Sequence, residues 1–470
     1  MTTFSPPQIV SYPSSVLGPQ MLLVARTDSG FAFRFWKDDN VFPGGVGNRW
    51  LDRQPWQFDP QNPPFDWTGF SAETGPIPPV PAWPLLGYID QDGVYRANAF
   101  FAFADVQSPT GDPHVVVGQP WWQIPIADVA FDTFQKDFLP RVGTTWYGAG
   151  PSPNPPGAVP RLNIFGSAPF GGAKLRELYW DGANWNWHDH NLELNGDELG
   201  PSSLIFPQPN HGYLFGVTAE KDNVLLFSYQ PAAADWDRAD FPTVPDGVTD
   251  LRAPVALTYS DDRGVNVSVF TVGLRNGKYH LFSIHQIFGH DWEGWQDYGA
   301  PPDEPVSPCE DLPSTPDIIR TRFLSGDAFT MTSACVGIDD QGLHIHLFGH
   351  SDILGPEGLG SNLLAEGVGQ GALVHFSWEG GDFQSGNWSF EATTRPVECL
   401  NVPTAFGPAT LQAAFETTSC AIYQGKTQNG QTRRRISAVG VTRPGNNNGN
   451  VWEYALDTAL GQGFQWLLIE

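Results

Sequence analysis

The sequence predicts an all-β fold, a single β-propeller of about seven four-stranded antiparallel blades that spans residues 1–470. Short runs of strand-forming residues alternate with turn residues along the whole chain. Two hairpin strands, an aromatic strand and a tryptophan-bearing strand recur in the same order at intervals of roughly 50–80 residues. Helical periodicity is nearly absent. These observations favour a radial repeat over an ordinary β-sandwich.

The unit at residues 254–301 shows the pattern most clearly. Its turns are Asp261-Asp262-Arg263-Gly264 and Arg275-Asn276-Gly277. An Asn-Gly pair between alternating apolar runs is the strongest short-range signal for a hairpin. Four antiparallel strands in roughly 48 residues match the size of one propeller blade. The strand-like runs are 254–260, 266–273, 278–286 and 292–298.

The other blades follow in order along the chain. Residues 8–12 form either the inner strand of the first blade or a strand that completes the last one. The second blade fits the pattern least well, because Trp121 and Trp122 stand where a fourth strand is expected. After the first blade, which runs to residue 52, the expected blades are 85–122, 144–189, 203–240, 254–298, 329–391 and 411–470.

Long insertions are expected at residues 53–84, 128–141 and 351–371. The first two join a fourth strand to the next inner strand, and the third joins a second strand to a third. In an up-and-down blade both kinds of connection leave the sheet at the same end. We therefore expect one face of the ring to carry these loops, and ligand sites favour loops held on a rigid scaffold.

The charge of the chain excludes several classes of partner. Acidic residues outnumber basic ones 51 to 25, for a formal charge of −26. Such a surface repels nucleic acid and anionic membrane. No apolar run approaches the length of a membrane span, and the first residues lack the basic and apolar regions of a signal peptide.

The four cysteines fall in two segments that read as copies of each other. In each copy one cysteine follows a tryptophan strand, and the second lies in the next inner strand. The symmetry predicts the disulfides Cys309–Cys335 and Cys399–Cys420, with four buried free thiols as the alternative. Disulfides would imply the secretory pathway or an extracellular location, and free thiols the cytoplasm.

No familiar catalytic or cofactor motif is present, and we expect no cofactor. The chain has no nucleophile elbow, no metalloprotease helix, no phosphate loop and no dinucleotide fingerprint. His344 and His346 alternate on a strand, as do His188 and His190, so each pair could share a metal. Neither pair has a third partner nearby in sequence, and we interpret all four as partly exposed sheet residues. The Asp-Asp pairs are interpreted as turns.

Aromatic residues in and beside the insertions are the candidate ligand-binding residues. Tryptophans in fourth strands are interpreted as core, whereas those outside the repeat can line a pocket. By loop position we select His350, Trp67 and Trp122 as candidate catalytic hydrogen-bond donors. The candidate ligand-binding residues are Trp56, Phe65, Trp83, Trp146, Trp180 and Asp352.

The blade pattern resembles that of the fungal fucose-specific lectins and the related bacterial lectin propellers, most closely over residues 175–189 and 279–299. The resemblance covers most of the chain and implies a propeller fold. In those lectins each blade repeats an Arg, Glu and aromatic set that holds a sugar. Here Arg176 and Glu177 near Trp180 are the nearest match, and the other blades do not repeat it.

Loop-decorated members of this fold are also similar to the propeller-type hetero-Diels–Alderases of fungal tropolone–sesquiterpene biosynthesis. Our first hypothesis is therefore one aromatic pocket that binds a mostly apolar small molecule and promotes a cycloaddition by positioning and hydrogen bonding. Positioning alone can supply about 7–11 kcal/mol. The second hypothesis is a glycan-binding lectin with one or two surviving sites, which stacks sugar on Trp180 or Trp146. The third is a structural or protein-binding propeller.

Overall fold

The computed structural model describes part of the chain in detail. The described residues are 7–12, 20–27, 30–37, 49–52, 56–57, 85–89, 95–102, 121–125, 139–149, 158–167, 174–180, 185–193, 202–208, 211–218, 220–230, 235–305, 322–351, 372–380, 387–393, 399–404, 407–412, 415–426, 432–442, 451–461 and 463–469.

Seven four-stranded sheets form within the described residues, which confirms the predicted all-β class and the expected seven blades. In six of these sheets the four strands follow one another in chain order from the inner strand to the outer one. The strands of blades one to three are β1 (Gln8–Tyr12), β2 (Gln20–Thr27), β3 (Gly30–Lys37), β4 (Arg49–Asp52); β5 (Trp56–Gln57), β6 (Leu85–Ile89), β7 (Tyr95–Ala102), β8 (Trp121–Pro125); and β9 (Leu139–Ala149), β10 (Ala158–Ser167), β11 (Lys174–Trp180), β12 (Trp185–Glu193).

Blades four to seven follow the same plan. Their strands are β13 (Ser203–Gln208), β14 (His211–Val217), β15 (Val224–Gln230), β16 (Asp235–Ala239); β17 (Val255–Asp261), β18 (Gly264–Arg275), β19 (Lys278–Ile287), β20 (Gln296–Asp297); β23 (Phe329–Asp339), β24 (Gly342–Ser351), β25 (Leu373–Glu379), β26 (Asn387–Thr393); and β29 (Phe415–Lys426), β30 (Thr432–Thr442), β31 (Val451–Asp457), β32 (Gln465–Leu468). Two small two-stranded sheets follow blades five and six in the sequence. They are β21 (Glu304–Pro305) with β22 (Arg322–Phe323), and β27 (Cys399–Thr404) with β28 (Gly407–Gln412).

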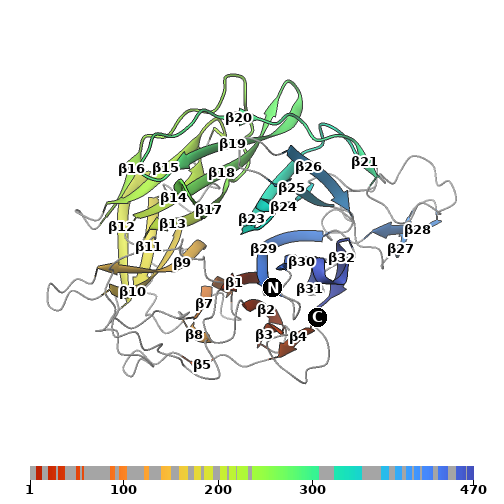
Figure 1. Ribbon diagram of the computed structural model, residues 1–470, viewed down its shortest axis with the longest axis horizontal. Helices are drawn as coiled ribbons and strands as arrows, with labels where there is room; N and C mark the ends of the chain where they lie inside the picture. The colour runs from red at the N-terminus through yellow and green to blue at the C-terminus, as the bar shows by residue number, and fades with distance from the viewer. Residues whose placement is uncertain are drawn as a thin grey trace.

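The sheets close into a ring. The inner strands of blades two to six each contact the inner strand of the next blade, β29 of blade seven contacts β1, and β2 of blade one contacts β6 of blade two. Figure 1 shows the sheets arranged radially, with both chain termini beside blades one and seven. Residues 8–12 therefore form the inner strand of the first blade, which was one of the two predicted roles.

Blade five confirms the first three predicted strands and corrects the fourth. Its strands β17, β18 and β19 lie at the first three predicted runs and are joined by the two predicted turns, whereas β20 covers only 296–297 of the predicted run 292–298. Asn276 and Gly277 both have positive φ, 52° and 78°, as a tight two-residue hairpin requires. At the other turn, the Asp261 carboxylate accepts hydrogen bonds from the backbone and side chain of Arg263.

Blade two corrects the sequence-based assignment. Trp121 and Trp122 belong to its third strand, β8, rather than replacing a fourth strand. The outer strand is β5, which comes from the predicted insertion 53–84 and pairs in parallel with β8 through Trp56 and Trp122. The loop prediction was wrong at Trp56 because the missing edge strand is supplied by residues that precede the blade in sequence. In the same way, the predicted insertion 128–141 ends early, because residues 139–141 begin β9.

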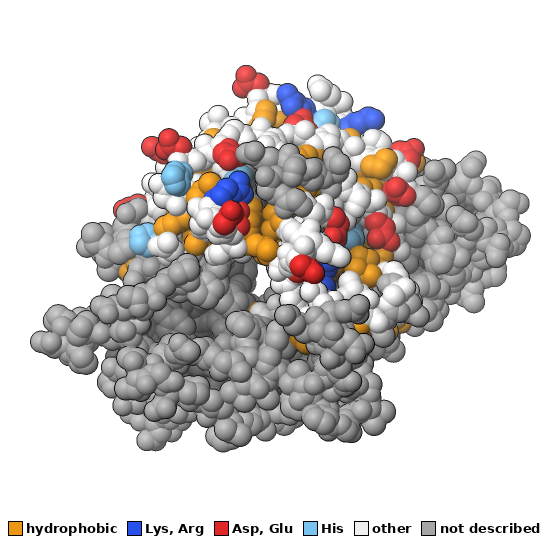
Figure 2. Space-filling view, in the orientation of Figure 1, with side chains coloured by type: hydrophobic (Ala, Val, Ile, Leu, Met, Phe, Trp, Pro, Cys, Tyr) orange, Lys and Arg blue, Asp and Glu red, His pale blue; other side chains and the backbone are white. Residues whose placement is uncertain are grey.

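On the face shown in Figure 2, the acidic side chains of the described residues are scattered rather than collected in one patch. Among the described residues, no helix is long and apolar enough to cross a membrane.

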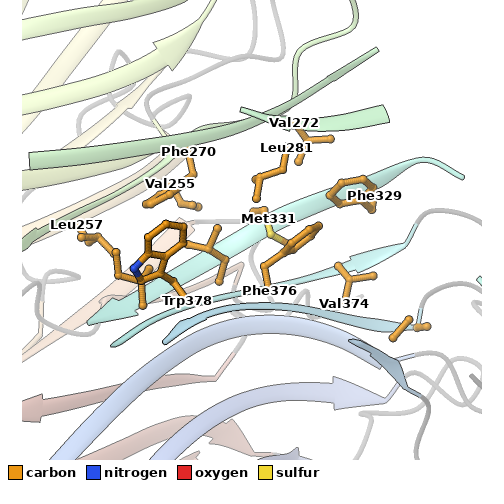
Figure 3. Packing of buried hydrophobic residues seen from close by; sticks show 14 of the residues in the cluster. Val255, Leu257, Phe270, Val272, Leu281, Phe329, Met331, Val374, Phe376 and Trp378 are labelled. Carbon is orange, nitrogen blue, oxygen red and sulfur yellow. The ribbon is translucent and has the colours of Figure 1, made fainter. Parts of the chain in front are cut away.

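The hydrophobic core lies between neighbouring blades. The best-defined cluster joins blades five and six, where Phe270 and Leu281 face Phe329, Phe376 and Trp378 (Figure 3). Comparable clusters fill the junctions of blades three and four, four and five, six and seven, and seven and one. At these five junctions neighbouring blades bury apolar side chains against each other, and these contacts stabilise the ring.

The predicted disulfides are not formed at the two cysteines whose side chains are described. Cys335 on β23 and Cys420 on β29 are both free thiols. The prediction was wrong because these two residues lie on adjacent inner strands and interact with each other across the junction of blades six and seven. Burial, together with the hydrogen bond and charge of Cys420, raises the pKa of the Cys335 thiol. Cys309 and the side chain of Cys399 lie outside the described residues.

Candidate functional site

A polar hollow of about 300 Å³ opens at the junction of blades six and seven. Three blade-six residues of the β23–β24 turn contribute to its lining, together with residues from the start of β30 and from the turn after β31. The lining residues are Asp339, Asp340, Gln341, Thr432, Arg434 and Thr458. In an up-and-down blade the connections from first to second strand and from third to fourth strand lie at one end. The hollow is therefore at the end of the ring opposite to the β24–β25 connection, where the insertion 351–371 is predicted.

Local sequence places these side chains. Asp339 ends β23, and its carboxylate accepts a hydrogen bond of 2.9 Å from the backbone N–H of Gln341, which closes the turn. Gly342, with φ 112°, begins β24.

On the blade-seven side, Asp457 caps the short 3-10 helix η3 (Thr458–Leu460) by accepting a hydrogen bond from the backbone N–H of Ala459. Thr458 in turn accepts a hydrogen bond from the backbone N–H of Arg434. The Asp-Asp pair is thus a turn, as predicted, and it also lines the hollow.

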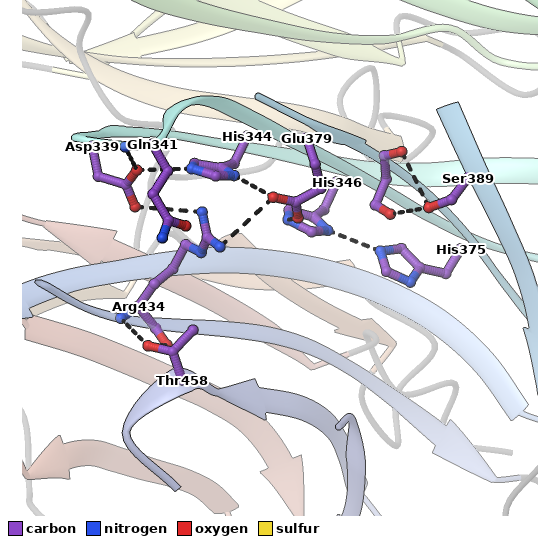
Figure 4. Close-up of polar contacts among 10 residues, drawn as sticks. Asp339, Gln341, His344, His346, His375, Glu379, Ser389, Arg434 and Thr458 are labelled. Atoms are coloured by element: carbon purple, nitrogen blue, oxygen red, sulfur yellow. Dashed lines mark hydrogen bonds and ion pairs between the residues drawn. The ribbon is translucent and has the colours of Figure 1, made fainter. Parts of the chain in front are cut away.

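A chain of acidic and imidazole groups lies behind the hollow (Figure 4). His344 lies between two carboxylates, with Nε2 2.8 Å from Asp339 Oδ1 and Nδ1 2.5 Å from Glu379 Oε2. The Arg434 guanidinium reaches both acids, at 3.4 Å from Asp339 and 3.7 Å from Glu379. Two carboxylates thus share one guanidinium and one buried imidazole.

The pKa values in this chain follow from its charges. Burial lowers the pKa of His344, but its hydrogen bonds to Glu379 and Asp339 outweigh burial, and the pKa is raised from 6.5. Burial raises the pKa of Asp339 and of Glu379, but the hydrogen bond from His344 and the positive charges of His344 and Arg434 together outweigh it, and both pKa values are lowered. The imidazole and the two carboxylates thus favour each other's charged forms.

A second imidazole pair continues the chain into the blade. His346 Nδ1 lies 2.9 Å from His375 Nε2, and the two rings stack with centroids 5.2 Å apart. Burial lowers the pKa of both, and the neighbouring charges of His375 and Arg434 add to the effect at His346. Glu391, 3.6 Å from His375, accepts a hydrogen bond of 2.6 Å from the Tyr454 hydroxyl.

This geometry corrects the interpretation of His344 and His346 as partly exposed. Each is about 1% exposed. They point to the same side of β24, as their spacing predicts. His344 lies between Asp339 and Glu379, whereas His346 lies against His375 with its Nε2 3.5 Å from Glu379. Sequence could not identify Arg434 and Glu379 as their partners, because these come from other strands.

The predicted site residues whose backbone is described lie in three different blades. His350 lies at the far end of β24, roughly 20 Å from His344 at about 3.3 Å per residue. The backbones of Trp56 and Trp122 pair with each other in blade two, whereas Trp146 and Trp180 lie on β9 and β11 of blade three. The predicted residues Trp67, Phe65, Trp83 and Asp352, with residues 58–84 and 352–371, lie outside the described residues.

The Arg, Glu and aromatic set expected near Trp180 is used differently. Glu177 is buried and bonded to His190 and Asn163, so its carboxylate does not face solvent. Another set of one arginine, one glutamate and one aromatic residue lies between blades seven and one. There Arg435 bonds Glu453 at 2.8 Å and lies 3.7 Å from the ring of Trp36. All three side chains are buried, so this set joins two blades.

No protein-family model and no curated protein matches the chain. Among solved structures, it is similar to the fucose-recognising six-bladed lectin of Aleuria aurantia, at 11% identity and a TM-score of 0.37, covering 83% of this chain and 95% of that one. It is also similar to AofleA of Arthrobotrys oligospora, at 11% identity and a TM-score of 0.37, covering 83% of both chains. A DUF4623 family protein of Bacteroides eggerthii matches at 9% identity and a TM-score of 0.31 over 99% of both chains. The described part of this chain itself has seven four-stranded sheets.

Proposed function

We propose that the chain is a carbohydrate-binding protein and that the hollow between blades six and seven holds one neutral saccharide unit. The observation that carries the proposal is the composition of its lining: carboxylates, a guanidinium, an amide and hydroxyls, fixed by turns and ion pairs. Charged donors and acceptors at fixed positions suit the hydroxyl groups of a sugar, because hydrogen bonds to charged groups contribute about 1.5–3 kcal/mol each.

The charge of the lining favours a neutral ligand. Asp339 and Asp340 outnumber Arg434, and Arg434 is already paired with Asp339 and Glu379. With a formal charge of −26 over the whole chain, sialylated and sulfated glycans would be repelled. Among the described lining residues there is no aromatic ring on which a sugar could stack. We therefore expect weak binding at a single site, with a dissociation constant on the order of 1 mM, or about −4.1 kcal/mol.

The test is a titration with free monosaccharides, fucose, galactose, mannose and glucose, followed by ligand-observed NMR, together with a multivalent glycan array. We expect binding to at least one neutral sugar. The variants Asp340→Asn and Gln341→Ala change two exposed lining residues and should weaken that binding at least about 5-fold, a loss of roughly 1 kcal/mol.

The β17–β18 turn of blade five offers a matched control. Its Asp261-Asp262-Arg263-Gly264 has the same position in the blade as Asp339-Asp340-Gln341-Gly342, and Asp262 is exposed like Asp340. Asp262→Asn should leave sugar binding unchanged. If both Asp variants weaken binding equally, or if no neutral sugar binds, the proposal is wrong.

The hypothesis of a cycloaddition catalyst depends on the residues that line the predicted insertions. Most of these, including residues 58–84 and 352–371, lie outside the described residues, and no contact in the described part favours that reaction. Failure of every sugar, with saturable binding of an apolar fluorescent probe, would favour the small-molecule pocket. Failure of both would favour a structural or protein-binding propeller.

A further inference from the structure

Three metal-ligating side chains converge at the junction of blades three and four. His188 and His190 lie on β12, two residues apart and therefore on the same side of the strand. Asp235 begins β16, the outer strand of the next blade. One ligand atom from each of the three lies within 4.8 Å of the others, and this is the only such group among the described residues.

Both imidazoles face the same carboxylate oxygen. His190 Nδ1 lies 2.7 Å and His188 Nε2 3.3 Å from Asp235 Oδ1, and the two rings have centroids 4.3 Å apart. Zinc binds imidazole nitrogen and carboxylate oxygen at about 2.0–2.2 Å in a tetrahedron, whose edges are then about 3.3 Å. The His188–Asp235 separation already has this length. The His190–Asp235 separation would have to open by a few tenths of an ångström.

The outer hydrogen bonds are those that a metal-bound histidine needs. The second ring nitrogen of His190, Nε2, lies 2.9 Å from the Glu177 carboxylate. Glu177 is itself held by the side-chain amide of Asn163, and both are buried. A carboxylate behind a ligating histidine fixes its ring and raises its basicity. Asp235 is oriented by the backbone N–H of Trp236, at 2.8 Å.

One of the three side chains is buried and the other two are partly exposed, as in a metal site that is open to solvent. The His190 side chain is 1% exposed, whereas those of His188 and Asp235 are 39% and 40% exposed. A metal ion could therefore enter from solvent, and three protein ligands leave a fourth position for water or for a ligand atom.

We propose that His188, His190 and Asp235 form a binding site for one divalent transition-metal ion, zinc in the first place, that joins blade three to blade four. Glu177 acts as a positioning residue for His190. Nitrogen and carboxylate ligands without cysteine also suit cobalt and nickel, but magnesium and calcium prefer sites made of oxygen atoms.

The test uses the whole chain, treated with a chelator and then titrated with zinc and, separately, with cobalt. We expect one zinc per chain by calorimetry and elemental analysis. Cobalt should give the visible absorption of a site with nitrogen and oxygen ligands, without the near-ultraviolet charge-transfer band of a thiolate. That band would instead assign the metal to the cysteines, such as Cys335 and Cys420, and would overturn the proposal.

Substitution at the exposed ligands makes the test specific. His188→Ala and Asp235→Ala should remove zinc binding, and Glu177→Gln should weaken it roughly 10–100-fold. The matched control is His280→Ala in blade five, where His280 Nδ1 lies 2.8 Å from Asp297 in a histidine–aspartate pair that lacks a second histidine. It should bind zinc like the wild type. Absence of zinc binding, or equal binding by His188→Ala and His280→Ala, would show that the cluster only links the blades by hydrogen bonds.

Discussion

At the scale of single residues, the buried histidines divide by the partners of their rings. His190 and His344 each have a carboxylate at both ring nitrogens, and the hydrogen bonds to these acids raise their pKa despite burial. His285 faces Ser268 and Asn266, which carry no charge, and burial lowers its pKa to about 4. Histidines paired with carboxylates therefore favour the folded state at lower pH, whereas His285 favours it at higher pH.

His285 should make the protein sensitive to acid. Its pKa is about 4 in the folded chain and 6.5 as a free side chain, so the unfolded state binds more protons between these values and stability falls as pH decreases. Relative to His285→Gln, the wild type should lose about 2 kcal/mol of unfolding free energy between pH 8 and pH 5. Urea denaturation of both proteins at the two pH values measures this. His290→Gln, at an exposed position of the same blade, is the control, and a difference that does not change with pH would contradict the argument.

His344 should show the reverse dependence. A raised pKa in the folded state contributes stability that is complete below the unfolded value of 6.5 and is lost as pH rises through the folded value. The lowered pKa values of Asp339 and Glu379 add stability that is lost in acid, below their ordinary values of 3.8 and 4.5. The wild type should therefore exceed His344→Gln in stability most strongly between pH 5 and pH 6.5, and less at pH 9. Urea titrations across this range measure it, and an advantage that grows toward pH 9 would contradict it.

At the scale of elements, two glycines show what fixes the strands. Gly277 has φ +78° in the β18–β19 turn, and a Cβ there would meet nothing within 4 Å. Gly349 lies on β24 next to an irregularity in the pairing with β23, and a Cβ there would lie 1.9 Å from the backbone oxygen of Thr330. Gly277 is needed for its backbone conformation, and Gly349 for the close approach of two strands.

These two causes should differ in their effect on stability. Gly277→Ala is expected to lower the free energy of unfolding by about 1–2 kcal/mol, the cost of a left-handed conformation for an L-residue. Gly349→Ala should cost about 3 kcal/mol or more, since backbone must move in a packed blade. Denaturant midpoints of the two variants, compared in the same buffer, check the order. Equal costs would mean that blade six relaxes easily around position 349.

Strands and turns could be predicted because their signals are local. The Asn276-Gly277 turn and the alternating runs of β18 and β19 depend on residues that are neighbours in sequence, and the structure has them where expected. The outer strand of blade two was missed because β5 lies upstream of the blade that it completes. The two site clusters were missed for a related reason. Asp235 follows His190 by 45 residues and Arg434 follows Asp339 by 95, and only the packing of blade on blade brings them together.

At the scale of the whole molecule, the ring depends on one junction between chain ends. The inner strand of blade one, β1, lies against β29 of blade seven. Ser419 binds both backbone groups of Ile9, accepting from its N–H at 3.1 Å and donating to its carbonyl at 3.0 Å. Trp50 of blade one also donates to the Glu453 carboxylate of blade seven at 2.8 Å. The Ser419 side chain thus forms hydrogen bonds with the backbone N–H and C=O of Ile9 at the inner edge of β1, where these groups have no neighbouring strand to pair with.

Ser419→Ala should therefore weaken the closure of the ring. Both hydrogen bonds to Ile9 are buried, and leaving those backbone groups unpaired is expected to lower the free energy of unfolding by about 2 kcal/mol. Hydrogen exchange should show faster opening of β1 and β29 than of blades four and five, because only the closing junction has lost contacts. Ser389→Ala is the matched control: Ser389 also lies on a strand, bonded to Ser377 at 2.6 Å, but on an exposed outer edge. Its effect should stay within about 0.5 kcal/mol. If the two variants lose equal stability, or if exchange accelerates evenly around the ring, then the contacts between all blades, rather than this junction, limit opening.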